Sequence, residues 1–229
     1  MEIQLFNTQT SKPSIFQSGF IEGAKLIGAD KFGAQGRYGE GIKVAIIDTG
    51  CDVNHVNLKD RIIGVRNFTT DDRGDINNVS DYVGHGTATA SIIGASDIGD
   101  KGIIGVAPKC ELLILKALTR TGGRMAWVTE SINYAVEQGV DIISMSLGSS
   151  NKDADMYKAI KRAIAKNIMV VCASGNNGDN KADTIELNYP SGFNECISVG
   201  SVTYSKKYSR FTATNNEIDL VAMGEGYNN

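Results

Sequence analysis

The sequence contains only 3 prolines and 2 histidines among 229 residues, and no apolar run long enough to cross a membrane. Its net charge is −3, which gives no electrostatic attraction to nucleic acid or to an anionic membrane surface. Neither is therefore expected as a partner. The first residues lack the basic and apolar regions of a secretory signal, so a cytoplasmic protein is expected.

The cysteines are also few, and their spacing matches no zinc-binding pattern. They are Cys51, Cys110, Cys172 and Cys196. Cys110 and Cys172 border or lie within apolar segments, where a small buried thiol is common. Free structural thiols in a reducing compartment are therefore expected rather than disulfides.

What the chain does have is the composition of a globular α/β protein, with 41% hydrophobic residues, 21% charged residues and 26 glycines. Short apolar segments that read as strands alternate with segments of helical spacing. The predicted strands are 42–48, 111–117, 141–147, 168–173, 196–202 and 218–221, and the predicted helices are 84–95, 125–138 and 154–166. This order predicts an α/β fold, a parallel sheet with helices on both faces.

Three of these strands end in polar, glycine-rich segments. Asp48 closes the first, Ser146–Gly148 the third and Gly175–Asn177 the fourth. Ligand sites of parallel sheets lie at the carboxyl ends of the strands. We therefore expect a site where these segments meet.

Each polar candidate also has a purely structural interpretation. Asp48 is typical of a carboxylate that caps a turn, and His85, between two glycines, of a solvated or core histidine. Asn176 is typical of a left-handed turn. The second histidine, His55, is expected to pack in a loop. In a further interpretation, Asp48, Asp52 and His85 are metal ligands of a phosphatase-like site.

The joint order of the motifs is more specific than any single residue. DTG at 48–50, GHGT at 84–87, SLG at 146–148 and SGNNG at 174–178 resemble the subtilisin-like serine proteases, the subtilases. The resemblance extends from about residue 20 to the C-terminus, and the chain is similar to the intracellular bacterial branch. It implies a three-layer α/β fold, with a short N-terminal extension at 1–18 and a peptidase domain at 19–229.

The resemblance also implies roles for individual residues. Asp48 would orient His85, the general base and acid, and Asn176 would donate to the oxyanion. An extended peptide substrate would add as a strand between two edges. These edges are Gly122–Gly123 on one side and Ser146, Leu147 and Gly148 on the other. Met125, Leu147 and Trp127 would line apolar subsites, although Met125 and Trp127 fit ordinary helix packing equally well.

One part of the family pattern is not found within the 229 residues. The family places its nucleophile in a Gly-Thr-Ser-Met-Ala motif at the start of a long buried helix, and no segment here matches it. Ser174, Ser191 and Ser209 do not lie in such a motif. We expect a peptidase domain that is C-terminally incomplete and lacks the nucleophile helix. Its strands would then expose apolar faces, and the chain alone would be inactive.

A structural calcium ion is a further expectation from the resemblance. The family site would fall on Asn57, Asp97 and Asp100, where Asn57 replaces an aspartate of the family. Because calcium takes six to eight oxygen ligands, the loss of one carboxylate weakens this prediction.

Two functions remain open at this point. The chain is either the larger part of a subtilisin-type serine endopeptidase or a catalytically inactive subtilase fold that binds peptides or regulates. In either case, residues 1–18 are too short for a folded prodomain and are predicted to lie across the cleft and block it. The sequence predicts no oligomeric state.

Overall fold

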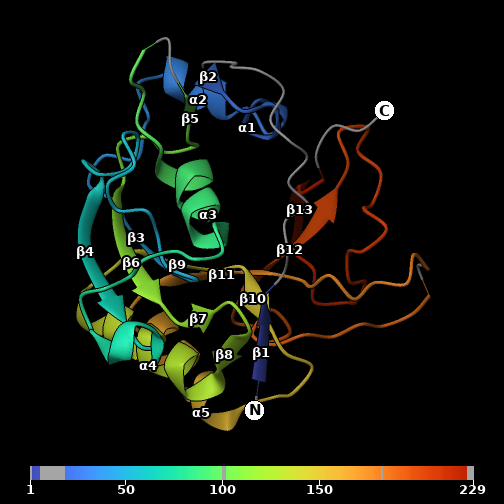
Figure 1. The fold of residues 1–229 in the computed structure, drawn as a ribbon. Coiled ribbons are helices and arrows are strands. Elements are labelled where there is room, and N and C mark those ends of the chain that lie inside the picture. The colour runs from blue at the N-terminus through green and yellow to red at the C-terminus, as the bar shows by residue number, and fades with distance from the viewer. Residues whose placement is uncertain (1, 6–18, 100–101, 182, 226–229) are drawn as a thin grey trace.

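The centre of the computed structural model, which describes residues 2–5, 19–99, 102–181 and 183–225, is a sheet of seven parallel strands (Figure 1). Their order is β13 (Leu220–Met223), β12 (Ile197–Val202), β11 (Met169–Ala173), β9 (Ile142–Met145), β3 (Lys43–Asp48), β6 (Glu111–Lys116) and β4 (Ile62–Asn67). The predicted parallel α/β sheet is confirmed.

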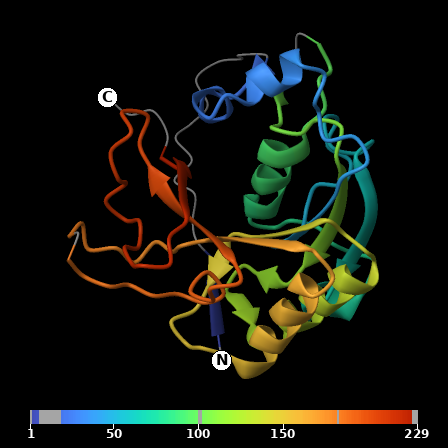
Figure 2. The same ribbon diagram turned by 180° about the vertical axis from the view of Figure 1, so that it is seen from behind.

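The central strand β3 shows why both faces of the sheet must be covered. Val44 and Ile46 point into one hydrophobic cluster, and Ala45 and Ile47 point into the other. The first cluster includes residues of α3 (His85–Gly94), and the second those of α4 (Met125–Glu137) and α5 (Ala154–Ile164). Figures 1 and 2 show α3 on one side of the sheet and α4 and α5 on the other.

The helices follow the apolar periodicity that predicted them. In α5 the buried side chains are Met156, Ala159, Ile160 and Ala163. Its N-cap residue is Asp153, whose carboxylate accepts hydrogen bonds from the backbone N–H groups of Asp155 and Met156 at 3.0 and 2.8 Å. Sequence periodicity and capping therefore agree on its start and on its buried face.

A second sheet of four antiparallel strands lies beside the main one, in the order β10 (Leu147–Gly148), β1 (Glu2–Leu5), β8 (Gly122–Arg124) and β7 (Leu118–Thr119). The prediction of a single strand over 141–147 was therefore wrong at its end. After Met145 the chain leaves the main sheet, and Leu147–Gly148 pair with β1 instead. The prediction also missed β1, because four residues carry too little periodicity to be recognised.

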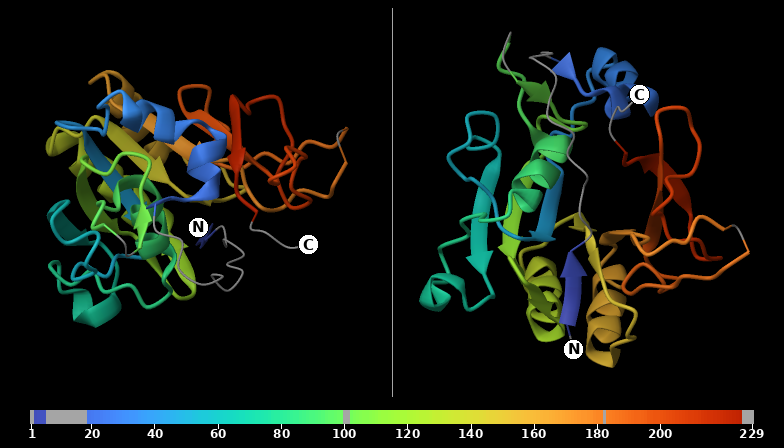
Figure 3. Two further views of the ribbon diagram at one scale, coloured as in Figure 1. Left: turned by 90° about the horizontal axis from the view of Figure 1, so that it is seen from above. Right: turned by 45° about the vertical axis from the view of Figure 1, so that its right-hand side comes forward.

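The remaining elements surround the ends of the main sheet. They are β2 (Gly19–Phe20), α1 (Glu22–Leu26), α2 (Ala29–Ala34), a 3₁₀ helix at Asp71–Gly74 and β5 (Ile103–Ile104). Figure 3 shows α1 and α2 near the end of the chain that carries β13. The last strand begins at Leu220 rather than at the predicted Ile218, and the edge strand β4 was not predicted. Among the described residues, no helix has the length and apolar character needed to span a bilayer.

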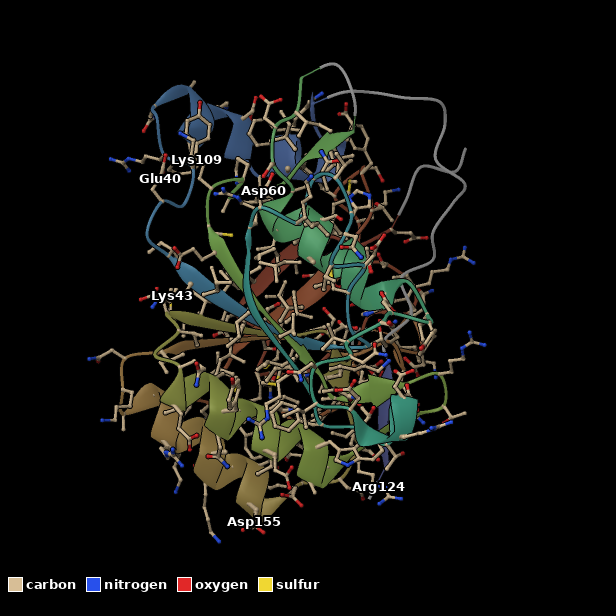
Figure 4. All side chains as sticks on the ribbon, turned by 60° about the vertical axis from the view of Figure 1, so that its left-hand side comes forward. Glu40, Lys43, Asp60, Lys109, Arg124 and Asp155 are labelled. Atoms are coloured by element: carbon tan, nitrogen blue, oxygen red, sulfur yellow. The ribbon has the colours of Figure 1, made fainter. Side chains whose placement is uncertain are left out.

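Glu40 and Lys109 form an ion pair of 3.0 Å on the surface. In Figure 4 they lie at the opposite end of the view from Arg124 of β8.

All four cysteines are free and buried. Burial is the main cause that raises the pKa of Cys51 to about 12 and that of Cys110 to about 11. Both thiols are therefore protonated at neutral pH and are poor nucleophiles.

The face of the main sheet against which α3 packs is well buried only on β3 and β6. Ile46, in the α3 cluster, is in register with Ser144, and Ser144 with Val171, so these side chains share a face. On β9, β11, β12 and β13 this face carries only partly buried or exposed residues: Ser144, Met169, Val171, Ala173, Ile197, Val199, Ser201, Leu220 and Ala222. Met169 is 49% and Leu220 59% exposed, whereas Val170, on the opposite face, is 0% exposed.

This difference between the faces predicts a difference in stability between neighbouring residues. Val170→Ala should lower the free energy of unfolding by about 2 kcal/mol, because the substitution removes the equivalent of two buried methylene groups and leaves a cavity. The matched change Met169→Ala, one residue earlier on the other face, should cost less than about 1 kcal/mol. Urea denaturation followed by circular dichroism measures both, and equal losses would contradict the assignment of the faces.

Candidate active site

A buried pair, Asp48 and His85, lies at the carboxyl end of β3. Asp48 is the last residue of that strand and is 1% exposed, and His85 is the first residue of α3 and is 5% exposed. Asp48 Oδ1 lies 2.7 Å from His85 Nδ1 and also accepts the backbone N–H of Thr49 at 2.7 Å. Asp48 Oδ2 is buried and has no hydrogen-bond partner among the described residues. Asp48 Oδ1 thus faces Nδ1 of the imidazole and fixes the orientation of the ring.

Two glycines of the DTG and GHGT motifs allow this approach. Gly50 has a φ of 109°, and a Cβ on it would overlap the carbonyl oxygen of Val79. A Cβ on Gly86 would overlap the carbonyl oxygen of Gly50. The turn after β3 and the first turn of α3 therefore pack backbone against backbone, which brings Asp48 and His85 within hydrogen-bond distance.

Asn176 and His85 line the same cavity, which has a volume of about 280 Å³. Asn176 follows β11 in the turn Ser174–Asn177, where Gly175 has a φ of 126°. Asn188 secures this turn, since its amide Nδ2 donates to the Ser174 carbonyl at 3.0 Å and to Asn177 Oδ1 at 2.7 Å. The cavity walls come from the partly uncovered face of β9, β11, β12 and β13.

The two edges expected to hold a peptide do flank an extended strand, and that strand is β1 of the same chain. Ile3 is in register with Gly123, Gln4 with Gly148 and Leu5 with Leu147, antiparallel in each case. A Cβ on Gly122 would come within 2.7 Å of the Ile3 carbonyl oxygen, so glycine is needed for this approach. Ser146 lies between β9 and β10 and lines the cavity with His85.

The groove between β8 and β10, which β1 fills, is bordered by apolar residues that also belong to the core. Ile3 is 1%, Leu147 1% and Met125 5% exposed, and all three belong to the cluster beneath α4 and α5. Trp127 is half-buried, packs against that cluster and has the Arg124 guanidinium 5.1 Å from its ring centre. Met125 therefore serves helix packing and also belongs to the cluster that buries Ile3, so the two interpretations are compatible.

The other sequence candidates make different contacts. Ser191 Oγ donates to the Asn188 carbonyl at 3.0 Å, and Ser209 Oγ lies 2.7 Å from Ser201 Oγ. His55 Nδ1 accepts the backbone N–H of Asn57 at 3.3 Å, within its own loop. Nowhere in the described part of the chain do three or more His, Cys, Asp or Glu residues gather as a metal site would require, which leaves the phosphatase-like interpretation without support.

In the region predicted to hold calcium, the side-chain amide of Asn57 connects two backbone carbonyl groups. Asn57 is 4% exposed, and its Nδ2 donates to the carbonyl oxygens of Ser96 and Ile103 at 3.0 and 3.4 Å. Asp97 Oδ1 accepts the N–H of Gly99 at 2.9 Å on the surface, and Asp100 lies outside the described residues. Asn57 thus directs N–H donors, and no oxygen ligand, at these two carbonyls, so its side chain does not act as a calcium ligand in this arrangement.

Sequence reasoning missed two buried or half-buried charges beside the site. Lys116 ends β6 next to Asp48, is 1% exposed, and donates to the Ser80 carbonyl at 2.6 Å. Asp81, four residues before His85, accepts hydrogen bonds from the first turn of α3. An aspartate just before a helix start is a recognisable capping signal and could have identified Asp81. No local pattern predicts a buried lysine.

The chain resembles known serine proteases over most of its length. A family model described as the Subtilase family matches residues 39–229. The chain is 47% identical over 226 residues to the major intracellular serine protease of Bacillus subtilis (strain 168), covering 98% of this chain and 70% of that protein. It is 49% identical over 204 residues to an intracellular serine protease of Paenibacillus polymyxa, covering 89% of this chain and 62% of that protein. Subtilisin DY of Bacillus licheniformis is 36% identical over 203 residues, 88% of this chain and 71% of that protein.

The Asn57 contacts predict a loop whose stability does not depend on calcium. Millimolar calcium or a chelator should leave the melting temperature unchanged. Asn57→Asp removes both donors and places a carboxylate beside two carbonyls, so it should cost about 1–3 kcal/mol without calcium and regain part of that with calcium. The exposed Asn54→Asp in the same loop is the matched control. A calcium-dependent melting temperature of the unmodified chain would contradict the prediction.

Proposed function

The chain belongs to the subtilase family, and we propose that it forms most of a serine endopeptidase whose nucleophile is supplied by a segment outside these 229 residues. The observation that carries the proposal is the buried contact of 2.7 Å between Asp48 Oδ1 and His85 Nδ1, beside a cavity that Asn176 also lines. Relatives named intracellular serine proteases support a location in the cytoplasm of a bacterium.

In the proposed reaction, Asp48 holds His85 Nδ1–H, so that Nε2 accepts the proton of the serine hydroxyl. The serine oxygen then attacks the peptide carbonyl carbon. Asn176 donates to the oxygen that becomes negative, and His85 returns the proton to the leaving amine. Water repeats the sequence to release the acyl group. Asp48 stabilises the imidazolium without becoming protonated itself.

The partly uncovered sheet face supports a place for the completing segment. Val171 and Val199 are only half-buried there, although they lie on interior strands of the main sheet. Burying apolar surface contributes about 25 cal/mol per Å², so a helix with an apolar side would be stabilised on this face. We infer that the serine-bearing segment covers it and places its hydroxyl in the cavity next to His85.

A fluorophosphonate probe, which labels activated serines, tests the proposal. The 229 residues should not react alone, whereas the chain extended by the C-terminal part of the Bacillus subtilis relative should be labelled at the added serine. His85→Gln in the extended chain should lower the labelling rate by at least about 1,000-fold, the scale of losing one member of a catalytic triad.

The matched control is His55→Gln, which changes the only other histidine of the 229 residues and should leave labelling intact. Equal labelling of the His85→Gln and unmodified extended chains would refute the assignment of the base. Absence of labelling in a folded, extended chain would refute the proposed function.

The position of β1 supports autoinhibition as part of this function. A substrate strand and β1 would need the same backbone groups of β8 and β10. Ile3 anchors the strand, since its side chain is buried with Leu147, whereas the Gln4 side chain is exposed. We infer that β1 must leave the groove before a peptide can bind; the remainder of the predicted extension, 6–18, lies outside the described residues.

Deleting residues 1–18 from the extended enzyme should therefore raise kcat/KM for a peptide substrate by at least 10-fold. This factor corresponds to about 1.4 kcal/mol of competition removed. Ile3→Ala should raise it in the same direction, while Gln4→Ala should not. Unchanged kinetics of the deleted enzyme would contradict the autoinhibitory role.

The same groove keeps a binding function open, because a strand can pair with β8 and β10 without any nucleophile. Chain 19–229 without an added segment would then bind extended peptides and leave them intact. Isothermal titration with a peptide of the sequence of residues 1–18 measures this binding. Binding without turnover in a folded, extended chain whose serine is unmodified would favour the binding protein over the enzyme.

A further inference from the structure

Asp81 accepts an unusual number of hydrogen bonds for a residue that the proposed reaction does not use. Its Oδ1 accepts Thr49 Oγ1–H at 2.9 Å and the backbone N–H groups of Val83 and Gly84 at 3.1 and 2.8 Å. Its Oδ2 accepts the N–H and the Oγ1–H of Thr87 at 2.9 and 2.7 Å. The half-buried carboxylate thus joins the turn after β3 to the loop before α3 and to the first turn of α3.

Helix α3 depends on these contacts because its own N-cap residue, Gly84, has no side chain to accept hydrogen bonds from the first N–H groups of the helix. Gly84 precedes the helix with a φ of 88° and no side-chain cap. The N–H of Gly86 donates instead to Thr49 Oγ1 at 2.9 Å, and the N–H of Thr87 donates to Asp81 Oδ2. Two of the free N–H groups at the start of the helix are therefore capped from outside it.

These external caps link the two members of the catalytic pair. Thr49 directly follows Asp48 and donates its N–H to Asp48 Oδ1 at 2.7 Å. Gly86 and Thr87 directly follow His85. Through Thr49 on one side and Thr87 on the other, Asp81 fixes the backbone next to Asp48 relative to the backbone next to His85.

The charge of Asp81 suits this role. Burial raises its pKa, but the hydrogen bonds from Thr87, Gly84 and Thr49 outweigh burial and hold the pKa below the ordinary value of an aspartate. An ionised carboxylate near a helix N-terminus is stabilised by the helix dipole. Lys116 steadies the same loop one residue earlier, through the Ser80 carbonyl and an ion pair of 3.0 Å with Asp71.

We propose that Asp81 is a positioning residue, which sets the distance between Asp48 and His85 by capping α3 and holding Thr49. Its importance for catalysis rests on the proposed function, but its effect on the geometry of the pair does not. A spectroscopic test on the 229-residue chain therefore separates the two.

The test follows the Nδ1 proton of His85 in ¹H NMR spectra of ¹⁵N-histidine-labelled chain. A proton held in a short hydrogen bond to a buried carboxylate gives a strongly deshielded signal, and with two histidines the assignment needs only one His55→Gln sample. Asp81→Asn keeps one acceptor oxygen and replaces the other with an N–H donor, so the hydrogen bonds on either the Thr87 side or the Thr49 side are lost. It should therefore shift this signal upfield or broaden it beyond detection.

Asp75→Asn is the matched control, because Asp75 lies in the same loop and accepts the N–H of Asn77 at 3.0 Å but is exposed. It should leave the signal unchanged. If Asp81→Asn does not fold, Thr87→Val tests the same contact by removing one hydroxyl, and Thr87→Ser should restore the signal. An unchanged His85 signal in folded Asp81→Asn or in folded Thr87→Val would overturn the proposal.

In the chain extended with a serine-bearing segment, Asp81→Asn should lower kcat by up to about 100-fold with little change in KM, since misplacing a reacting group by about 1 Å can cost that much. A change in KM with kcat unchanged would overturn the positioning role. If the unmodified extended chain is inactive, the proposed function fails, and the NMR signal still decides whether Asp81 positions His85.

Discussion

The local structure at the end of β3 depends on satisfying one carboxylate that is buried inside the protein. A buried carboxylate is costly without hydrogen-bond partners, so the Asp48 side chain needs them. His85 and the Thr49 N–H supply them at Oδ1, and each must be held in place in turn. The glycines at 50 and 86, the loop before α3 and the external capping of that helix are all arranged around this requirement. The partner Asp48 needs for stability is the imidazole that the proposed reaction would use.

Much of the architecture was predictable because its determinants are local. The apolar runs of β3, β6 and β11 and the periodicity of α4 and α5 identified the parallel sheet. The glycine-rich strand ends indicated the edge of the sheet where Ser146 and Asn176 line one cavity with His85. The pairing of Asp48 with His85 was predicted from the resemblance to the subtilases, and in the structure Gly50 and Gly86 permit the close backbone approach that it requires.

Other features depended on contacts between distant segments and could not be read locally. Strand β1 is recognisable only from its partners, since Ile3 is buried in the cluster that also contains Leu147 and Met125. The break between β9 and β10 is likewise visible only in the pairing of Leu147 and Gly148 with β1. At Asn57 a single amide joins two carbonyls from another loop, which no spacing in the sequence reveals. Local rules thus locate Asp48 and His85 better than they locate the segments that surround them.

Strand β1 also has a kinetic consequence, because it is covalently joined to the groove that it fills. A tethered strand acts at an effective concentration of the order of millimolar, and this value does not fall when the protein is diluted. A free peptide at micromolar concentration competes poorly against it. One cut in the connecting segment would convert the tethered strand into a free peptide at the concentration of the protein itself. Under the proposed autoinhibition, the groove would therefore respond to a single cleavage as a one-way switch, and afterwards to the concentration of free peptide as an ordinary equilibrium.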